Sequence, residues 1–117
     1  MRAIFSIDCD GTLFKEDWPN IGEPFQEAIK ALREIKRLGH YIILNTCRQG
    51  ILLEEVLAFM KRYDIPYDYA NENIPDKIAL FGDCRKIGAD VFVDDRNIGK
   101  WTWIDVLEKA RQLAWEK

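Results

Sequence analysis

The chain has 117 residues, of which 48% are hydrophobic and 12% aromatic, and it carries a formal net charge of −3 at pH 7. This length and composition suit one domain with a buried core, so we expect a single domain over residues 1–117. The slightly acidic balance lacks the basic footprint of a protein that mainly binds nucleic acid or a membrane surface.

The cellular compartment is suggested by two absences in the sequence. No apolar run near the start indicates a signal peptide, and no stretch approaches the roughly 20 apolar residues of a membrane helix. The three cysteines (Cys9, Cys47 and Cys84) are odd in number and have no C-x-x-C spacing, which favours free thiols in a reducing compartment. We therefore expect a cytoplasmic protein without membrane contact.

The first predicted elements are a strand, a loop and a helix. Residues 3–7 are β-branched, aromatic or small and contain neither Gly nor Pro, which predicts a short buried strand. Residues 11–23 lose this pattern and hold several turn-forming residues, so we expect a loop. A helix is expected over 24–38, because Pro24 suits a first helical turn, apolar residues follow at helical spacing, and Gly39 provides a stop.

The second half of the chain continues the alternation of strands and helices. A continuous apolar run at 41–44 is typical of a buried parallel strand, and the spacing of apolar residues predicts a helix over 51–63. The remaining elements, in chain order, are a strand at 67–70, a polar turn at 71–76, a segment at 78–81 that fits a strand or a short helix, a strand at 89–93 and an amphipathic helix at 103–115.

This order predicts an α/β domain with an open, mainly parallel sheet. Ligands of such sheets bind at the carboxyl ends of the strands. Polar residues follow three of the predicted strands: Asp8 and Asp10, then Thr46, then Asp94 and Asp95. If the strands are parallel, all of these residues converge on one edge of the sheet.

Four carboxylates at one edge suggest phosphate chemistry with a cation. Like charges this close resist being ionised together, which indicates a bound cation or a task that needs one acid protonated. Carboxylate oxygens suit Mg²⁺, and an Asp with its charge partly neutralised can attack phosphorus. Phosphoryl transfer also needs donors to the phosphoryl oxygens; Thr46 offers a hydroxyl and Lys86 is the best placed cation.

Four segments occur in an order that resembles a known superfamily. They are D-C-D-G-T-L at 8–13, I-I-L-N-T at 42–46, C-R-K at 84–86 and V-F-V-D-D at 91–95. The set is similar to the four motifs of the haloacid dehalogenase (HAD) superfamily, which consists largely of Mg²⁺-dependent phosphatases and phosphotransferases. The D-x-D-G-T segment is the most specific of the four. The resemblance implies a three-layer, Rossmann-like α/β fold with a mainly parallel central sheet.

The resemblance also implies a role for each acid. Asp8 is the implied nucleophile, and Asp10 the implied general acid/base, which protonates the leaving group and later activates water. Mg²⁺ is the implied cofactor, held by Asp8, Asp94 and the backbone carbonyl of Asp10, with Asp95 acting through water. His40, the only histidine, lies at the opposite end of its strand, and we expect a structural role for it.

The implied phosphate ligands are Thr46 and Lys86, with Gly11 and Arg48 beside them. Two points stay open. Lys77 is a rival for the lysine role, since the spacing of the third motif varies. Arg48 flanks the pocket and is either a phosphate ligand or a structural partner of the acids.

The spacing of the motifs leaves no room for a cap domain. One loop and one helix fit between the first and second motifs, and little more than a helix, a strand and a turn fits between the second and third. The loop at 12–23 is unusually apolar, so we expect it to fold over the site with Phe14 or Trp18 at the rim. An open site admits a phosphorylated polymer end, or a phosphorylated small molecule if a homodimer closes over it.

The leading interpretation is a Mg²⁺-dependent phosphohydrolase that acts through an aspartyl-phosphate. The alternatives are a phosphorylation-switch module, similar to response-regulator receivers, and a non-catalytic binding protein on the same fold. The order of the motifs argues against a receiver, because receivers place an acid pair on the first strand end and the phosphorylated Asp on the third. The presence of Asp10 argues against a binding protein, which has little need for an acid/base.

Overall fold

A parallel sheet of four strands forms the centre of the computed structural model, which describes residues 1–116. The strands are β1 (Ile4–Ile7), β4 (Tyr41–Leu44), β5 (Tyr69–Ala70) and β6 (Val91–Val93). Their order across the sheet is β5-β4-β1-β6, and each neighbouring pair runs parallel. The predicted α/β class with a parallel central sheet is therefore confirmed, and the carboxyl ends of these strands lie at a common edge.

The described chain has helices at α1 (Gln26–Arg37), α2 (Gly50–Arg62), α3 (Pro75–Phe81) and α4 (Trp103–Trp115). The bounds of α1, α2 and α4 lie within two residues of those expected from the spacing of apolar residues. Helix α3 decides the ambiguous segment at 78–81 in favour of a helix, and it begins inside the expected turn. Pro75 explains this start, because its fixed φ suits the first turn of a helix. None of the helices among residues 1–116 is both long and apolar enough to cross a membrane.

The expectation of a loop at 11–23 is wrong for most of these residues, because the chain forms an antiparallel hairpin there. Strand β2 (Phe14–Asp17) pairs with β3 (Asn20–Pro24). The sequence hides this hairpin, because β2 is mostly charged and Gly22 resembles a break. Gly22 in fact permits close pairing, since a Cβ at this position would collide with the Lys15 carbonyl. Of the two residues expected at the rim, Phe14 is excluded because its ring is fully buried against Phe59, whereas Trp18 is exposed.

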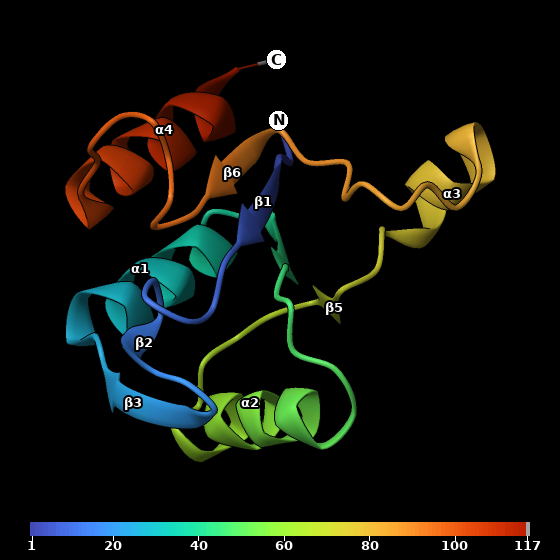
Figure 1. The fold of residues 1–117 in the computed structure, drawn as a ribbon. Coiled ribbons are helices and arrows are strands. Elements are labelled where there is room, and N and C mark those ends of the chain that lie inside the picture. Colours follow the sequence, from blue (N-terminus) through green and yellow to red (C-terminus); the bar gives the residue numbers. More distant parts are fainter. Residues whose placement is uncertain (117) are drawn as a thin grey trace.

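Alternate side chains of the strands build two apolar clusters, one on each face of the sheet. The larger cluster unites β1, β4 and β6 with apolar side chains of α1, α2 and α4. The smaller one consists of Ile4, Ile43, Ile74 and Ile87. Figure 1 shows α1 and α4 together on one side of the sheet and α3 on the other. Helix α3 has no buried residue, so this second covering layer is thin.

His40 has the structural role that its place in the sequence predicts. The side chain is fully buried and packs at 5.2 Å, between ring centroids, from Phe5. Its Nδ1 accepts a hydrogen bond from the Ala3 backbone N–H at 2.9 Å, and Nε2 lies 2.7 Å from the Ala110 carbonyl oxygen. The imidazole therefore ties the start of β1 to the middle of α4.

We expect His40→Ala to destabilise the fold by about 3 kcal/mol, because it leaves the buried Ala3 N–H without its partner, removes a contact with the Ala110 carbonyl and opens a cavity. The free energy of unfolding in urea measures the loss. Gln112→Ala is the control, since Gln112 is exposed on α4, the helix that His40 contacts. Loss of this side chain should cost less than about 0.5 kcal/mol. A loss for His40→Ala no larger than that of the control would contradict this role.

Candidate active site

Asp8 stands at the carboxyl edge of the sheet because β1 and β6 are paired up to this point. Its backbone N–H donates to the Val93 carbonyl oxygen at 2.8 Å, one residue beyond the last strand residue of β1. The Thr12 hydroxyl donates to Asp8 Oδ2 at 2.8 Å. Asp94 directly follows β6, so the two acids emerge from adjacent parallel strands.

Asp8, Asp94 and Asp95 form an acidic cluster, in which each residue offers an oxygen within 4.8 Å of the others. Asp8 and Asp94 are half-buried and Asp95 is exposed. Burial raises the pKa of Asp8 to about 7; the Thr12 hydrogen bond opposes this rise, while the charges of Asp94 and Asp95 add to it. The cluster therefore offers hard oxygen donors and an excess of negative charge, and both suit a divalent cation.

The backbone around the cluster is fixed by specific contacts. The Trp101 indole N–H donates to the Asp94 carbonyl oxygen at 2.8 Å, and the Arg96 backbone N–H donates to Asp94 Oδ1 at 2.8 Å. Gly11 has a φ of +82°, and a Cβ at this position would collide with Asp95 Oδ2. A glycine is therefore required at this position both by the turn and by the approach of Asp95.

The predicted phosphate contact of Gly11 competes with a bond inside the turn. The Gly11 N–H donates to the Phe14 carbonyl oxygen at 2.9 Å. A phosphate can be bound by this amide only if it replaces that carbonyl. In the structure Gly11 therefore acts first as a turn residue that gives Asp95 room.

Asp10 does not belong to the acidic cluster, because its side chain faces Arg48. Arg48 Nε donates to Asp10 Oδ2 at 2.8 Å, and a terminal nitrogen of the same guanidinium donates to Oδ1 at 2.7 Å. The Arg48 side chain is 0% exposed. Arg48 is therefore a structural partner of an acid, the second of the two roles left open by the sequence. The pKa of its guanidinium rises further because of the hydrogen bonds to Asp10.

Thr46 follows β4, the strand beside β1, and so lies at the same edge as Asp8. Its backbone N–H donates to Asn71 Oδ1 at 2.9 Å, and its hydroxyl oxygen accepts the Arg48 backbone N–H at 3.1 Å. Thr46 does not cap α2, whose N-cap is Gln49. Its place at the edge matches the expected one.

Asn71 is a site residue that the sequence reasoning misses. Its side chain accepts from the Thr46 N–H and donates to the Arg48 carbonyl oxygen at 3.2 Å, so it fixes the turn after β4. Asn71 follows β5 directly and has a φ of +55°. The signal was present, since a polar residue after an apolar strand lies at the ligand-binding edge of a parallel sheet.

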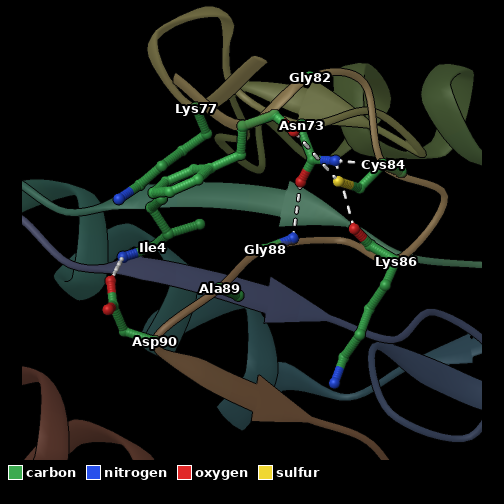
Figure 2. A pocket seen from close by; sticks show the side chains of 10 residues that line it. Ile4, Asn73, Lys77, Gly82, Cys84, Lys86, Gly88, Ala89 and Asp90 are labelled. Carbon is green, nitrogen blue, oxygen red and sulfur yellow. Dashed lines mark hydrogen bonds between the residues drawn. The ribbon is translucent and has the colours of Figure 1, made fainter. Parts of the chain in front are cut away.

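Lys86 and Lys77 both line a pocket of about 230 Å³ between α3 and the thinly covered face of the sheet. Figure 2 shows them leaving it in different directions: Lys77 extends past Ile4 at the start of β1, and Lys86 extends across the sheet toward the end of β1. Lys86 Nζ lies 5.6 Å from the ring centroid of Phe92 in β6. This direction favours Lys86 as the lysine nearer the acids.

A separate groove, of about 680 Å³, borders the acidic cluster at Asp95. Its walls come from the turn at Gly11 and Thr12, from Asp95, and from the connection between β6 and α4. The groove is open to solvent beside Asp95. The site thus has free space next to its carboxylates.

The fold and site together define an α/β protein with a parallel sheet and an acidic cluster at its carboxyl edge. The chain is similar to a conserved protein coded by a locus of Bacteroides thetaiotaomicron, with 30% identity and a TM-score of 0.85 over 97% of this chain and 93% of the other. The chain belongs to the same family as that protein. It is also similar to a crystal structure of an MCSG target from Vibrio cholerae, with 25% identity and a TM-score of 0.50 over 97% of each chain. Comparisons with protein-family models and with curated proteins give no match.

Proposed function

We propose that the protein is a Mg²⁺-dependent phosphohydrolase of the HAD type, which has no cap domain and acts through an aspartyl-phosphate at Asp8. One observation carries the proposal. Asp8, Asp94 and Asp95 offer oxygens within 4.8 Å of one another at the ends of adjacent parallel strands, and Asp8 opens a D-x-D-G-T segment. The three-layer, Rossmann-like arrangement of that superfamily is part of the same proposal.

Mg²⁺ fits the donor set of this edge. The carboxylates of Asp8, Asp94 and Asp95 would hold it, together with the Asp10 carbonyl that the resemblance implies. The pKa of Asp8 is raised mainly by burial, and the charges of Asp94 and Asp95 add to this rise; a bound cation would offset their repulsion. When bound, Mg²⁺ would neutralise charge on Asp8 and on the phosphoryl oxygens.

The side chains of the chain divide the remaining chemistry. An Asp8 oxygen attacks phosphorus, the bond from phosphorus to the leaving oxygen breaks, and Asp10 gives that oxygen a proton. Water then attacks phosphorus, Asp10 takes a proton from it, and the bond between Asp8 and phosphorus breaks to release phosphate. The Thr46 hydroxyl and the Lys86 ammonium bind the phosphoryl oxygens during both steps.

The substrate is a phosphorylated small molecule or a phosphorylated polymer end. The open groove of about 680 Å³ beside Gly11 and Asp95 leaves space for the part of the substrate that does not react. A polymer end needs no further cover. A small molecule would be better shielded from water if a homodimer closed over the groove.

The test is a panel of p-nitrophenyl phosphate, phosphorylated metabolites, nucleotides and oligonucleotides with phosphorylated ends, assayed for phosphate release with Mg²⁺ and with EDTA. We expect release that requires Mg²⁺. Stable phosphorylation of Asp8 by a small phosphodonor, without turnover, would favour the phosphorylation switch instead. No release and no phosphorylation by folded protein in Mg²⁺ would overturn the proposal.

A further inference from the structure

Arg48 joins two parts of the molecule that the proposed reaction treats separately. It is the largest fully buried side chain among residues 1–116. One side of its guanidinium contacts both oxygens of Asp10, at 2.8 and 2.7 Å. The other side donates to the carbonyl oxygens of Pro19, in the turn between β2 and β3, and of Asn20, at the start of β3, at 3.1 and 3.0 Å.

The contact with Asp10 fixes the direction of its carboxylate without blocking it. A guanidinium that binds a carboxylate through two parallel hydrogen bonds fixes the plane of the carboxylate. We call this pair of hydrogen bonds the Arg48–Asp10 fork. Each carboxylate oxygen has two lone pairs, and the fork occupies one lone pair on each oxygen. The Asp10 side chain is 16% exposed, so it is held and still reachable.

The position of the guanidinium in turn depends on the hairpin. Besides the two carbonyl contacts, the Arg48 guanidinium carbon lies 4.8 Å from the ring centroid of Trp18 and 5.7 Å from that of Phe14. Phe14 begins β2 and is fully buried, whereas Trp18 is 51% exposed in the turn. The hairpin thus provides both carbonyl acceptors and both aromatic faces around Arg48.

We propose that Arg48 is the positioning residue of Asp10, and that the β2–β3 turn holds Arg48 in place. The hairpin then contributes to proton transfer without contacting the substrate. This inference rests on the proposed role of Asp10 as the acid/base of a phosphohydrolase. Aiming a proton donor matters because a misplacement of about 1 Å can cost on the order of 10²-fold in rate.

Arg48→Lys tests the positioning role, because lysine keeps the charge but lacks the planar fork. The readout is kcat/KM, which reports the steps up to departure of the leaving group and not the later attack of water. It is measured for p-nitrophenyl phosphate, whose leaving group needs little protonation, and for glycerol 2-phosphate, whose leaving group needs a proton. We expect kcat/KM for glycerol 2-phosphate to fall on the order of 10²-fold and kcat/KM for p-nitrophenyl phosphate to fall much less. Equal losses with both substrates would overturn the positioning role and leave Arg48 a structural residue. Arg62→Lys, at an exposed arginine of α2, should change neither rate.

Amide hydrogen exchange of residues 14–24 tests the link to the hairpin without any assay of activity. Arg48→Lys and Asp10→Asn each break the fork, and both should speed exchange in the hairpin. Asp94→Asn removes an acid whose side chain accepts from the Arg96 N–H and not from Arg48, and it should leave hairpin exchange unchanged. Unchanged exchange in both fork variants would overturn the link to the hairpin. Absence of phosphate release by the wild type would instead contradict the proposed function. The contact between Arg48 and Asp10 would then have no role in catalysis.

Discussion

Asp8→Asn is expected to abolish Mg²⁺-dependent phosphate release and any covalent phosphoenzyme. The amide keeps the shape of the side chain but is not a nucleophile, so no bond to phosphorus forms. The phosphoenzyme is measured by mass spectrometry after acid quenching, and turnover by phosphate release. Asn also relieves the repulsion from Asp94 and Asp95, so the variant should fold at least as well as the wild type.

Asp10→Asn is the companion variant, and it should behave differently. It should lower turnover on the order of 10²–10⁴-fold, with a smaller loss in phosphorylation by substrates that have very good leaving groups. Because Asp10 pairs with the buried Arg48, the substitution can also destabilise the fold. The thermal unfolding of the variant must therefore be measured too, and its rates must be expressed per folded molecule. Full activity of Asp8→Asn would end the assignment of the nucleophile, whatever Asp10→Asn does.

Three of the four carboxylates expected at this edge form the acidic cluster, and strand pairing made the positions of Asp8 and Asp94 predictable; Asp10 instead binds Arg48. Asp8 and Asp94 each follow an apolar strand, and parallel neighbours bring their ends together whatever the loops do. The same logic places Thr46 at this edge, after β4. Helices α1, α2 and α4 were predictable because each has an apolar face at helical spacing.

The side-chain partners were not predictable, because they depend on where loops meet. Nothing in the sequence ties Arg48 to Asp10 and to the carbonyls of Pro19 and Asn20, which are brought together only by the hairpin. The hairpin was not predicted, because its strands carry few apolar residues and its pairing depends on Gly22. Local periodicity therefore predicts the elements better than it predicts the contacts between loops.

Mg²⁺ binding is expected to weaken as the pH falls below about 7. The pKa of Asp8 is raised to about 7, chiefly by burial, so at lower pH the cation must displace a proton from a ligand. With one proton displaced and Asp8 already half-protonated at pH 7, the apparent Kd should rise about fivefold from pH 7 to pH 6, and change little from pH 7.5 to pH 8.5. Calorimetric titration of Mg²⁺ into the wild type at these pH values measures the change.

The same shift should affect the stability of the metal-free protein, with the opposite dependence on pH. The folded state holds the Asp8 proton up to about pH 7, whereas an unfolded Asp loses it near its ordinary value of 3.8. The folded state therefore binds more protons between these values, and the free energy of unfolding in EDTA should fall as the pH rises from about 4 to 7. Mg²⁺ should reverse this loss at pH 8, by about 2.7 kcal/mol at a concentration of 100 Kd.

Two variants separate the contributions to this behaviour. Asp94→Asn should remove most of the stabilisation by Mg²⁺, because it deletes a proposed ligand and keeps Asp8. Asp8→Asn should flatten the pH dependence of stability in EDTA, since the titrating group is gone. An apparent Kd for Mg²⁺ that is equal at pH 6 and pH 8 in the wild type would mean that the cation does not bind Asp8. Mg²⁺ would then have to be bound elsewhere, and the proposed chemistry at this edge would lose its cofactor.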